Sequence, residues 1–195
     1  MLMEGNNTLL LRGNAFYLKS LFPEDVAENY IQWLKNPTIN EFLVVRQAPP
    51  TLEKQKHYVA SFDHRTNFIF GIYVNQQDQL IGSQTLRICP KNKKGVFGYF
   101  VGDRQYWGTT AALTSCYLLL EFAFMNLNLY RVEGGALKNN IRSLFNFKKL
   151  GFTQESVQRE AFLINGSFTD CFYFGILKKE WAMHRTKFLS FGINE

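Results

Sequence analysis

Val101-Gly-Asp-Arg-Gln-Tyr-Trp-Gly-Thr-Thr110 is the stretch of sequence that decides the fold. An apolar strand is expected just before it, at 96–101, and a long apolar helix just after it. A glycine-containing turn between a strand and a helix presents unpaired backbone N–H groups at the positive end of the helix dipole. The stretch therefore predicts a site for phosphate oxygens, although many α/β proteins of different function carry such a turn.

Three short motifs follow this turn at fixed distances and narrow the interpretation. They are Tyr130-Arg-Val-Glu133, Asn139-Asn-Ile-Arg-Ser143 and Lys149-Leu-Gly-Phe152. We expect Asn140 to open a helix that runs to Leu150, because asparagine favours the position before a helix. Gly151 then suits the left-handed conformation that ends a helix.

Length and composition predict one globular domain with a sizeable core. The chain has 195 residues, of which 46% are hydrophobic and 19% are charged. We expect residues 1–7 to be a flexible N-terminus and residues 182–195 to be a peripheral tail of the domain, which spans 1–195. No stretch reaches the roughly 18 uninterrupted apolar residues of a membrane helix, and the N-terminus lacks a secretory pattern. These features predict a cytoplasmic protein without membrane contact.

Cysteine usage and charge exclude further classes of function. Cys89, Cys116 and Cys171 are widely spaced, which predicts reduced core residues and no metal site. The net charge of +6 comes from scattered basic residues, with dense runs only at 91–94 and 178–179. No nucleic-acid-binding signature accompanies them. A mildly basic surface would equally suit the phosphates of a small ligand.

The pattern of apolar residues predicts mixed β and α structure around a strand–helix–strand–helix centre. Strands are expected at 9–12, 16–20, 68–74, 80–89, 96–101, 129–136, 152–165 and 168–177, the last two forming a hairpin around Gly166. Helices are expected to open at Pro23 and end at Asn36, and to run over 51–62, 109–126 and 140–150.

These residues, in this order, resemble the GCN5-related N-acetyltransferase (GNAT) superfamily, and more narrowly its bacterial RimJ/RimL-like branch. The resemblance covers 9–181 and rests on Asn36-Pro37, Ile81-Gly82, Tyr106-Trp107-Gly108, Tyr130-Arg131, Asn140-x-x-Ser143, Lys149-x-Gly-Phe152, Asp170 and Glu180-Trp181. It implies an α+β (mixed α/β) fold with a central, mostly antiparallel, twisted sheet of about seven strands. About four helices would flank the sheet, and a splayed pair of strands would bind acetyl-CoA. The implied activity is that of an N-acetyltransferase, an acyltransferase.

The resemblance places acetyl-CoA between the strands at 96–101 and 129–136. The pantetheine arm would pair with the backbone of Phe100 and Val101, and Asn140 and Ser143 would also contact the cofactor. The pyrophosphate would lie on the turn made by Gln105, Tyr106, Trp107, Gly108, Thr109, Thr110 and Ala111. Thr110 departs from the family pattern, which has a small residue there. Its hydroxyl either donates to a phosphate or crowds the site, and we favour retained binding because Gly108 and the Ala111-Ala112 pair remain small.

Acetyl transfer requires a neutral amine and a proton for the leaving thiolate. Many family members supply that proton from a tyrosine seven residues after the motif asparagine, where this chain has Phe147. We predict Ser143 as the substitute; the alternative is an ordinary residue of the helix N-terminus. Glu133 and Glu41 are the candidate bases, each with a plain surface carboxylate as the alternative. Asn140 binds the cofactor or only caps its helix.

The fold does not specify the acceptor. The runs at 135–143 and 37–46 resemble family members found with bacterial surface-polysaccharide synthesis, and Arg46 would suit a phosphate. We therefore favour a small-molecule amine, in particular an amino sugar on a nucleotide carrier, with Glu41 and Arg46 as acceptor-binding residues. The N-terminus of a ribosomal or other protein is the alternative. A catalytically inactive acetyl-CoA-binding module is the alternative of another class, and the chain is expected to be a monomer or homodimer.

Overall fold

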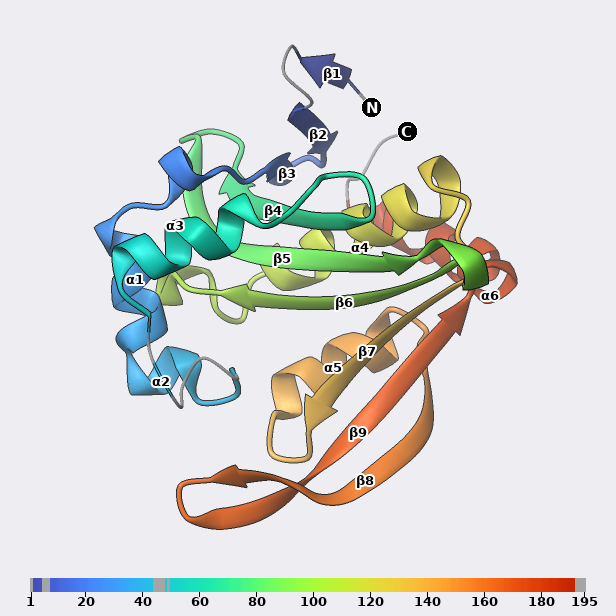
Figure 1. Cartoon of the computed structure of the whole chain (residues 1–195). Helices are drawn as coiled ribbons and strands as arrows, with labels where there is room; N and C mark the ends of the chain where they lie inside the picture. Colours follow the sequence, from blue (N-terminus) through green and yellow to red (C-terminus); the bar gives the residue numbers. More distant parts are fainter. Residues whose placement is uncertain (1, 5–7, 44–47, 49, 192–195) are drawn as a thin grey trace.

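A single sheet organises the chain in the computed structural model, which describes residues 2–4, 8–43, 48 and 50–191 (Figure 1). In these ranges the sheet has nine strands in the spatial order β1-β2-β3-β4-β5-β6-β7-β9-β8. The strands are β1 (Leu2–Glu4), β2 (Thr8–Arg12), β3 (Phe16–Ser20), β4 (Asn67–Val74), β5 (Gln79–Cys89), β6 (Lys94–Val101), β7 (Arg131–Leu137), β8 (Thr153–Ile164) and β9 (Ser167–Leu177). All neighbours pair antiparallel except β6 and β7, which are parallel.

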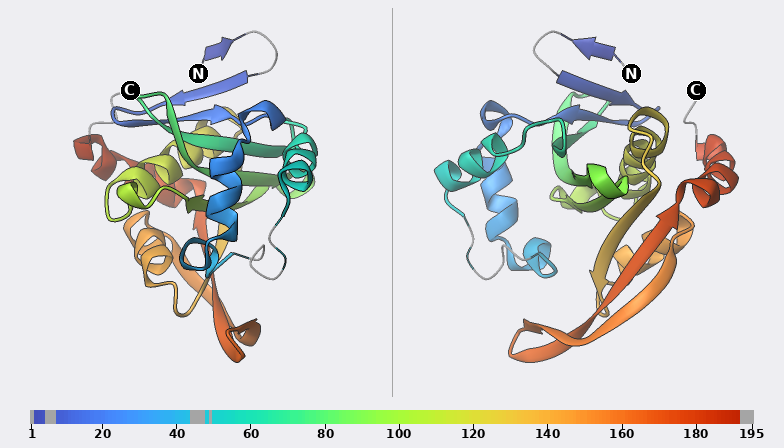
Figure 2. Two further views of the ribbon diagram at one scale, coloured as in Figure 1. Left: turned by 90° about the vertical axis from the view of Figure 1, so that its left-hand side faces the viewer. Right: turned by 45° about the vertical axis from the view of Figure 1, so that its right-hand side comes forward.

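Helices cover both faces of the sheet, with α1 and α3 on one side and α4, α5 and α6 on the other (Figure 2). The α-helices are α1 (Glu28–Lys35), α2 (Pro37–Asn40), α3 (Leu52–Ala60), α4 (Ala111–Glu121), α5 (Ile141–Lys149) and α6 (Lys178–His184). Short 3-10 turns are η1 (Pro23–Asp25), η3 (Pro90–Asn92), η4 (Arg104–Tyr106) and η6 (Arg185–Phe191), and the π-turn η5 (Phe122–Asn126) extends α4. None of the helices in the described ranges is long and apolar enough to cross a membrane.

The two faces have separate hydrophobic cores. The smaller one packs α1 and α3 against the sheet through Ile31, Val59 and Ile69, each at most 1% exposed. The larger one is built around α4, whose side chains are buried on most sides, as its apolar sequence predicts. β5 and β6 lie in the middle of the sheet, and β6 pairs with β5 along its whole length up to Val101, which places the end of β6 that precedes the glycine turn.

The expected mixed fold with a mostly antiparallel sheet is confirmed, but the first helix differs from its prediction. We expected one helix from Pro23 to Asn36. Instead, Pro23–Asp25 form one 3-10 turn, and Val26 inserts into the smaller core with extended backbone before α1 begins at Glu28. The end of that helix is as expected, because α1 stops at Lys35 and Asn36 has extended backbone, but the short helix α2 follows directly. The Asn36 side chain accepts a hydrogen bond from the Thr38 amide at 3.0 Å and so caps α2.

Both ends of the chain contribute more to the fold than expected. Leu2–Glu4, within the segment predicted to be flexible, pair with β2, while residues 1 and 5–7 lie outside the described residues. The tail is not wholly peripheral, because Phe188 is 5% exposed and its ring centroid lies 6.0 Å from that of Trp181. The C-terminal segment is therefore part of the larger core.

Candidate active site

A cavity opens where β6 and β7 separate. The two strands pair over only three residues each, from Lys94 with Arg131 to Val96 with Glu133. Beyond this point β6 continues to Val101 and β7 to Leu137 without pairing to each other, and the two ribbons diverge (Figure 1). A cavity of about 910 Å³ lies there and is lined by both strands, α5 and the β8–β9 hairpin. This volume suits a drug-sized or larger ligand.

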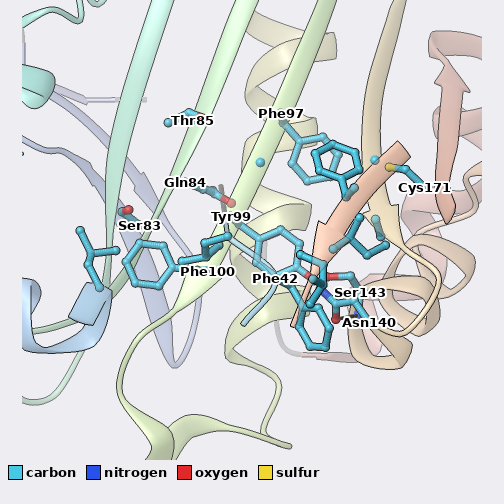
Figure 3. Close-up of a pocket in the computed structure, with 18 of the residues that line it drawn as sticks. Phe42, Ser83, Gln84, Thr85, Phe97, Tyr99, Phe100, Asn140, Ser143 and Cys171 are labelled. Atoms are coloured by element: carbon cyan, nitrogen blue, oxygen red, sulfur yellow. Dashed lines mark hydrogen bonds between the residues drawn. The ribbon is translucent and has the colours of Figure 1, made fainter. Parts of the chain in front are cut away.

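The cavity is apolar with a few polar groups and little charge. Its aromatic lining includes Phe42, Phe97 and Phe100, and its polar lining includes Asn140 and Ser143 (Figure 3). Among the described lining residues, Arg87 is the one with a formal charge, and none is an aspartate or glutamate. No group of three or more potential metal ligands occurs in the part of the chain that the structure describes.

The floor of the cavity on the α1 side carries a buried pair of hydroxyl groups. Tyr30 Oη lies 2.7 Å from Ser83 Oγ, and the two residues are 2% and 4% exposed. Burial raises the pKa of Tyr30 above its ordinary value, because the phenolate form would lose its hydration. The pair is therefore neutral at physiological pH and offers hydrogen bonds without charge.

The glycine turn has the open backbone that the sequence predicts. Gly108 has φ +79°, and a Cβ built on it would meet no atom within 4 Å. The Ala111 amide donates to Thr109 Oγ1 at 3.2 Å, whereas in the described residues no acceptor takes the amides of Gly108, Thr110 and Ala112. Thr110 is exposed and its side chain does not cap α4. The Thr110 side chain therefore leaves the neighbouring amides uncovered.

Two arginines reinforce the positive character of the turn, and no local sequence pattern predicts that they meet. The guanidinium carbons of Arg104 and Arg142 lie 5.4 and 4.3 Å from the ring centroid of Trp107. Trp107 also donates from Nε1 to the Val101 carbonyl at 2.8 Å, which holds the turn against the end of β6. Arg142 comes from α5, so this stack joins the two helix N-termini that flank the splayed strands.

The two predicted residues of α5 lie together at the cavity. Asn140 Oδ1 accepts the Ser143 amide at 3.1 Å, so the capping role that we left open for Asn140 is present. Both residues line the cavity, and the side-chain nitrogen of Asn140 is not used by the cap. Phe100 lines the cavity as well, whereas Val101 and the turn residues Gln105 through Ala111 are not part of its lining. The turn is attached to the end of β6 and to α5 through the contacts of Trp107 with Val101 and Arg142.

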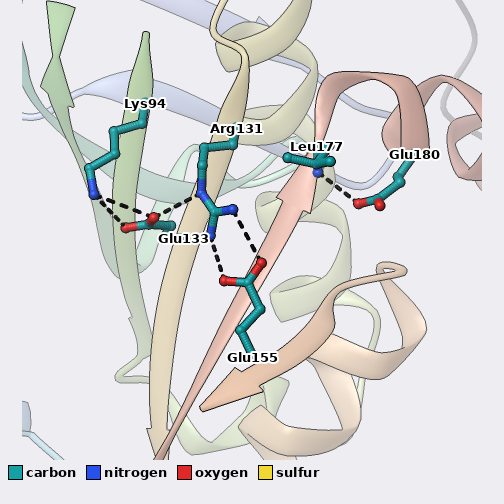
Figure 4. A network of polar contacts seen from close by, with 6 residues as sticks. All are labelled: Lys94, Arg131, Glu133, Glu155, Leu177 and Glu180. Atoms are coloured by element: carbon teal, nitrogen blue, oxygen red, sulfur yellow. Dashed lines mark hydrogen bonds and ion pairs between the residues drawn. The ribbon is translucent and has the colours of Figure 1, made fainter. Parts of the chain in front are cut away.

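Glu133, one of the two candidate bases, lies outside the cavity lining and within a network of ion pairs. Its carboxylate lies 3.2 Å from Lys94 Nζ and 2.8 Å from Arg131 Nε, and Arg131 also binds Glu155 at 2.6 Å (Figure 4). Strand alternation alone did not reveal the direction of the Glu133 side chain. Its carboxylate lies between two cations in a network that links β6, β7 and β8.

The other two polar candidates are at the edge of the site or beyond it. Glu41 follows α2 and lines a second, smaller cavity of about 200 Å³ beside the β8–β9 hairpin. The two cavities share Phe42 and Asn165 in their linings, so they are adjacent. Arg46 lies outside the described residues.

Residues 16–153 match the family described as "Acetyltransferase (GNAT) domain". The chain belongs to this acetyltransferase family. It is 27% identical to "Probable N-acetyltransferase YjcK" of Bacillus subtilis over 83% of this chain and 93% of that protein. Spermidine N-acetyltransferase from Vibrio cholerae, solved with CoA and spermine, superimposes with a TM-score of 0.77 and 20% identity over 86% of this chain and 98% of that one. RimL, a ribosomal L7/L12 alpha-N-protein acetyltransferase solved with coenzyme A, superimposes with a TM-score of 0.78. Its sequence is 18% identical, and the match covers 87% of this chain and 98% of that one.

Family membership makes the chain an acetyltransferase of the GNAT type. Its departure from the family pattern at Phe147, where many members have a tyrosine, can be related to the packing of this side chain. Phe147 is 3% exposed, and its ring stacks on Phe174 with centroids 4.5 Å apart. A methyl group built on Gly134 would lie 2.7 Å from Phe147 Cζ, the atom that carries the hydroxyl in tyrosine. The tip of the ring therefore lies close to the β7 backbone at Gly134, and Phe147 also lines the cavity.

Phe147→Tyr should destabilise this GNAT domain rather than restore a proton donor. The added hydroxyl would overpack the contact of this ring with Gly134, which costs about 3 kcal/mol. Thermal unfolding should show a midpoint about 6–12 °C lower for a chain of this size. Phe145→Tyr is the matched control, because Phe145 is 52% exposed on the same helix. A Phe147→Tyr variant as stable as the natural chain and faster in acetyl transfer would contradict this expectation.

Proposed function

We propose that this protein transfers the acetyl group of acetyl-CoA to the primary amine of a small molecule. The observation that carries the proposal is the cavity between β6 and β7, together with an open glycine turn that Trp107 attaches to the end of β6 and to α5. The amine nitrogen attacks the thioester carbonyl, the carbon–sulfur bond breaks, and the sulfur leaves as a thiolate. Holding both reactants in one cavity replaces an encounter of two molecules by a reaction within one complex.

The turn suits the pyrophosphate of the cofactor. The amides of Gly108, Thr110 and Ala112 have no acceptor in the described residues, and the exposed Thr110 hydroxyl adds a further donor. Arg104 and Arg142 add positive charge next to these amides. The pantetheine arm would then extend along the unpaired part of β6, at Phe100 and Val101, toward Asn140 and Ser143.

The charge of the cavity favours an acceptor that is neutral or anionic apart from its amine. A polyamine carries several positive charges, and binding it in a largely buried site requires carboxylates to compensate them. The described lining has no carboxylate and one arginine, Arg87. Arg87 is suited to a phosphate, and the neutral Tyr30–Ser83 pair to hydroxyl groups. We therefore favour an amino sugar on a nucleotide carrier over a polyamine, and a protein N-terminus remains the alternative acceptor.

Replacement of Arg87 should affect the acceptor and not the cofactor. With a nucleotide-linked amino sugar as acceptor, Arg87→Ala should raise KM about tenfold at unchanged kcat, because it removes one exposed charge-assisted contact. The matched control is Arg65→Ala, since Arg65 is exposed and outside the cavity lining. An unchanged KM for every phosphate-bearing acceptor that the enzyme uses would contradict the assignment of Arg87.

The proposal as a whole is tested by calorimetry with acetyl-CoA, followed by release of free thiol with a panel of amines. The panel contains a nucleotide-linked amino sugar, spermidine and a peptide with a free N-terminal alanine. Turnover with the amino sugar supports the proposed acceptor, and turnover with the peptide alone supports the alternative. Binding of acetyl-CoA without turnover of any amine would support an inactive cofactor-binding module, and no binding would overturn the proposal.

A further inference from the structure

A phenol from β6 faces the α5 residue that we predict to donate to the leaving group. Tyr99 Oη lies 3.4 Å from Ser143 Oγ, and Asn146 Nδ2 donates to the same phenol oxygen at 2.7 Å. Tyr99 and Ser143 both line the cavity, and Figure 3 shows them approaching each other from β6 and α5. No local sequence pattern predicts this contact, because the two residues are 44 positions apart.

The hydrogen bond from Asn146 decides how the Tyr99 hydroxyl is used. A side-chain amide nitrogen is only a donor, so the phenol oxygen accepts, and its own hydrogen remains available to a second partner. Ser143 Oγ is the partner within reach. Burial raises the pKa of Tyr99, so the phenol keeps its hydrogen throughout the physiological range. The oxygen–oxygen distance is long for a hydroxyl pair, and such contacts often shorten when substrate binds.

We propose that Tyr99 is a positioning residue that donates to Ser143 Oγ and thereby directs the Ser143 hydroxyl hydrogen toward the sulfur of acetyl-CoA. The inference rests on the proposed function and adds the residue that orients its proton donor. As the carbon–sulfur bond breaks, the electron pair stays on sulfur, and the Ser143 hydroxyl donates to the developing thiolate. The amine gives its surplus proton to water. Ser143 gives its hydroxyl proton to the leaving thiolate, and water then returns a proton to Ser143.

Three of the other hydroxyl groups that line the described cavity already have side-chain partners elsewhere. Tyr30 and Ser83 bond to each other on the α1 side, and Tyr173 Oη donates to Gln158 at 3.0 Å. Phe147 has no hydroxyl and packs against Gly134. Tyr99, on strand β6, thus performs part of the role that the family tyrosine would have on helix α5.

Steady-state kinetics separate this role from a structural one. Tyr99→Phe should lower kcat about tenfold and Ser143→Ala about a hundredfold, with little change in the KM for acetyl-CoA. The double variant should be no slower than Ser143→Ala, because a residue that acts through Ser143 has no effect once Ser143 is gone. Tyr73→Phe is the matched control: Tyr73 is a buried phenol of β4, 6% exposed, and lies outside the cavity lining. Additive losses in the double variant would overturn the proposal.

A second measurement needs no amine acceptor. The pKa of the thiol of bound CoA is followed by the ultraviolet absorbance of its thiolate, with bound desulfo-CoA as the reference. Hydroxyl groups that donate to the thiolate lower this pKa, so Ser143→Ala and Tyr99→Phe should each raise it by about 0.5–1 unit, and Tyr73→Phe should not. An unchanged pKa in Tyr99→Phe would overturn the role of Tyr99. Failure of CoA to bind the natural chain would instead overturn the proposed function.

Discussion

Gly108→Trp should weaken acetyl-CoA binding about a hundredfold while the domain stays folded. The amides around Gly108 are open, and an indole on this residue would cover them. Losing two charge-assisted hydrogen bonds to phosphate at about 1.5 kcal/mol each costs about 3 kcal/mol, which is about a hundredfold in Kd. Calorimetry with acetyl-CoA measures the change directly.

Gly108→Ala separates the bulk of the new side chain from backbone strain. Gly108 has φ +79°, so any L-residue there costs about 1–2 kcal/mol of stability. Alanine brings this strain without covering the amides, because its Cβ would meet no atom within 4 Å. Both variants should therefore lose similar thermal stability, while the tryptophan variant alone loses most of its affinity. Equal affinities in the two variants would show that phosphate does not bind at this turn.

The turn could be predicted from the sequence because its signals are local. A strand, a glycine and a helix follow one another within 101–110, and the positive φ at Gly108 is what only glycine adopts readily. The caps at Thr51 and Asn140 were predictable for the same reason, since each side chain bonds an amide three residues later. The break before α1 was not, because Val26 leaves helical geometry to fill the smaller core, and that core is assembled from distant segments.

In the candidate site, too, the features carried by neighbouring residues could be predicted, and the contacts between distant residues could not. Asn140 and Ser143 follow from spacing on one helix, and the structure brings both to the cavity. Tyr99 comes to Ser143, and Arg104 to Arg142 across Trp107, only through tertiary packing. These contacts are invisible in a single sequence, because they join an element of the sheet or a turn to a helix dozens of residues away. The direction of Glu133 was hidden for the same reason.

Glu121 connects the C-terminal segment to the domain. Its Oε1 accepts hydrogen bonds from Trp181 Nε1 at 2.6 Å and from Arg185 Nε at 2.9 Å, and its Oε2 pairs with Arg185 Nη2 at 2.5 Å. Trp181 is fully buried and packs on Tyr117 with ring centroids 5.3 Å apart. The only acidic residue of the apolar α4 therefore has a structural role at the point where α6 meets the larger core.

Glu121→Ala should be among the most destabilising single changes in the chain. It leaves the indole N–H of Trp181 buried without an acceptor and Arg185 without its carboxylate, which together cost about 3 kcal/mol. The midpoint of thermal unfolding should fall by about 6–12 °C. Glu121→Gln is the matched control, because its amide oxygen still accepts from Trp181 while the charge is lost, so its loss should be intermediate. If Glu121→Ala unfolded at the same temperature as the natural chain, the C-terminal segment would be the peripheral tail that its sequence suggests, and the burial of Trp181 would have to be maintained by ring packing alone.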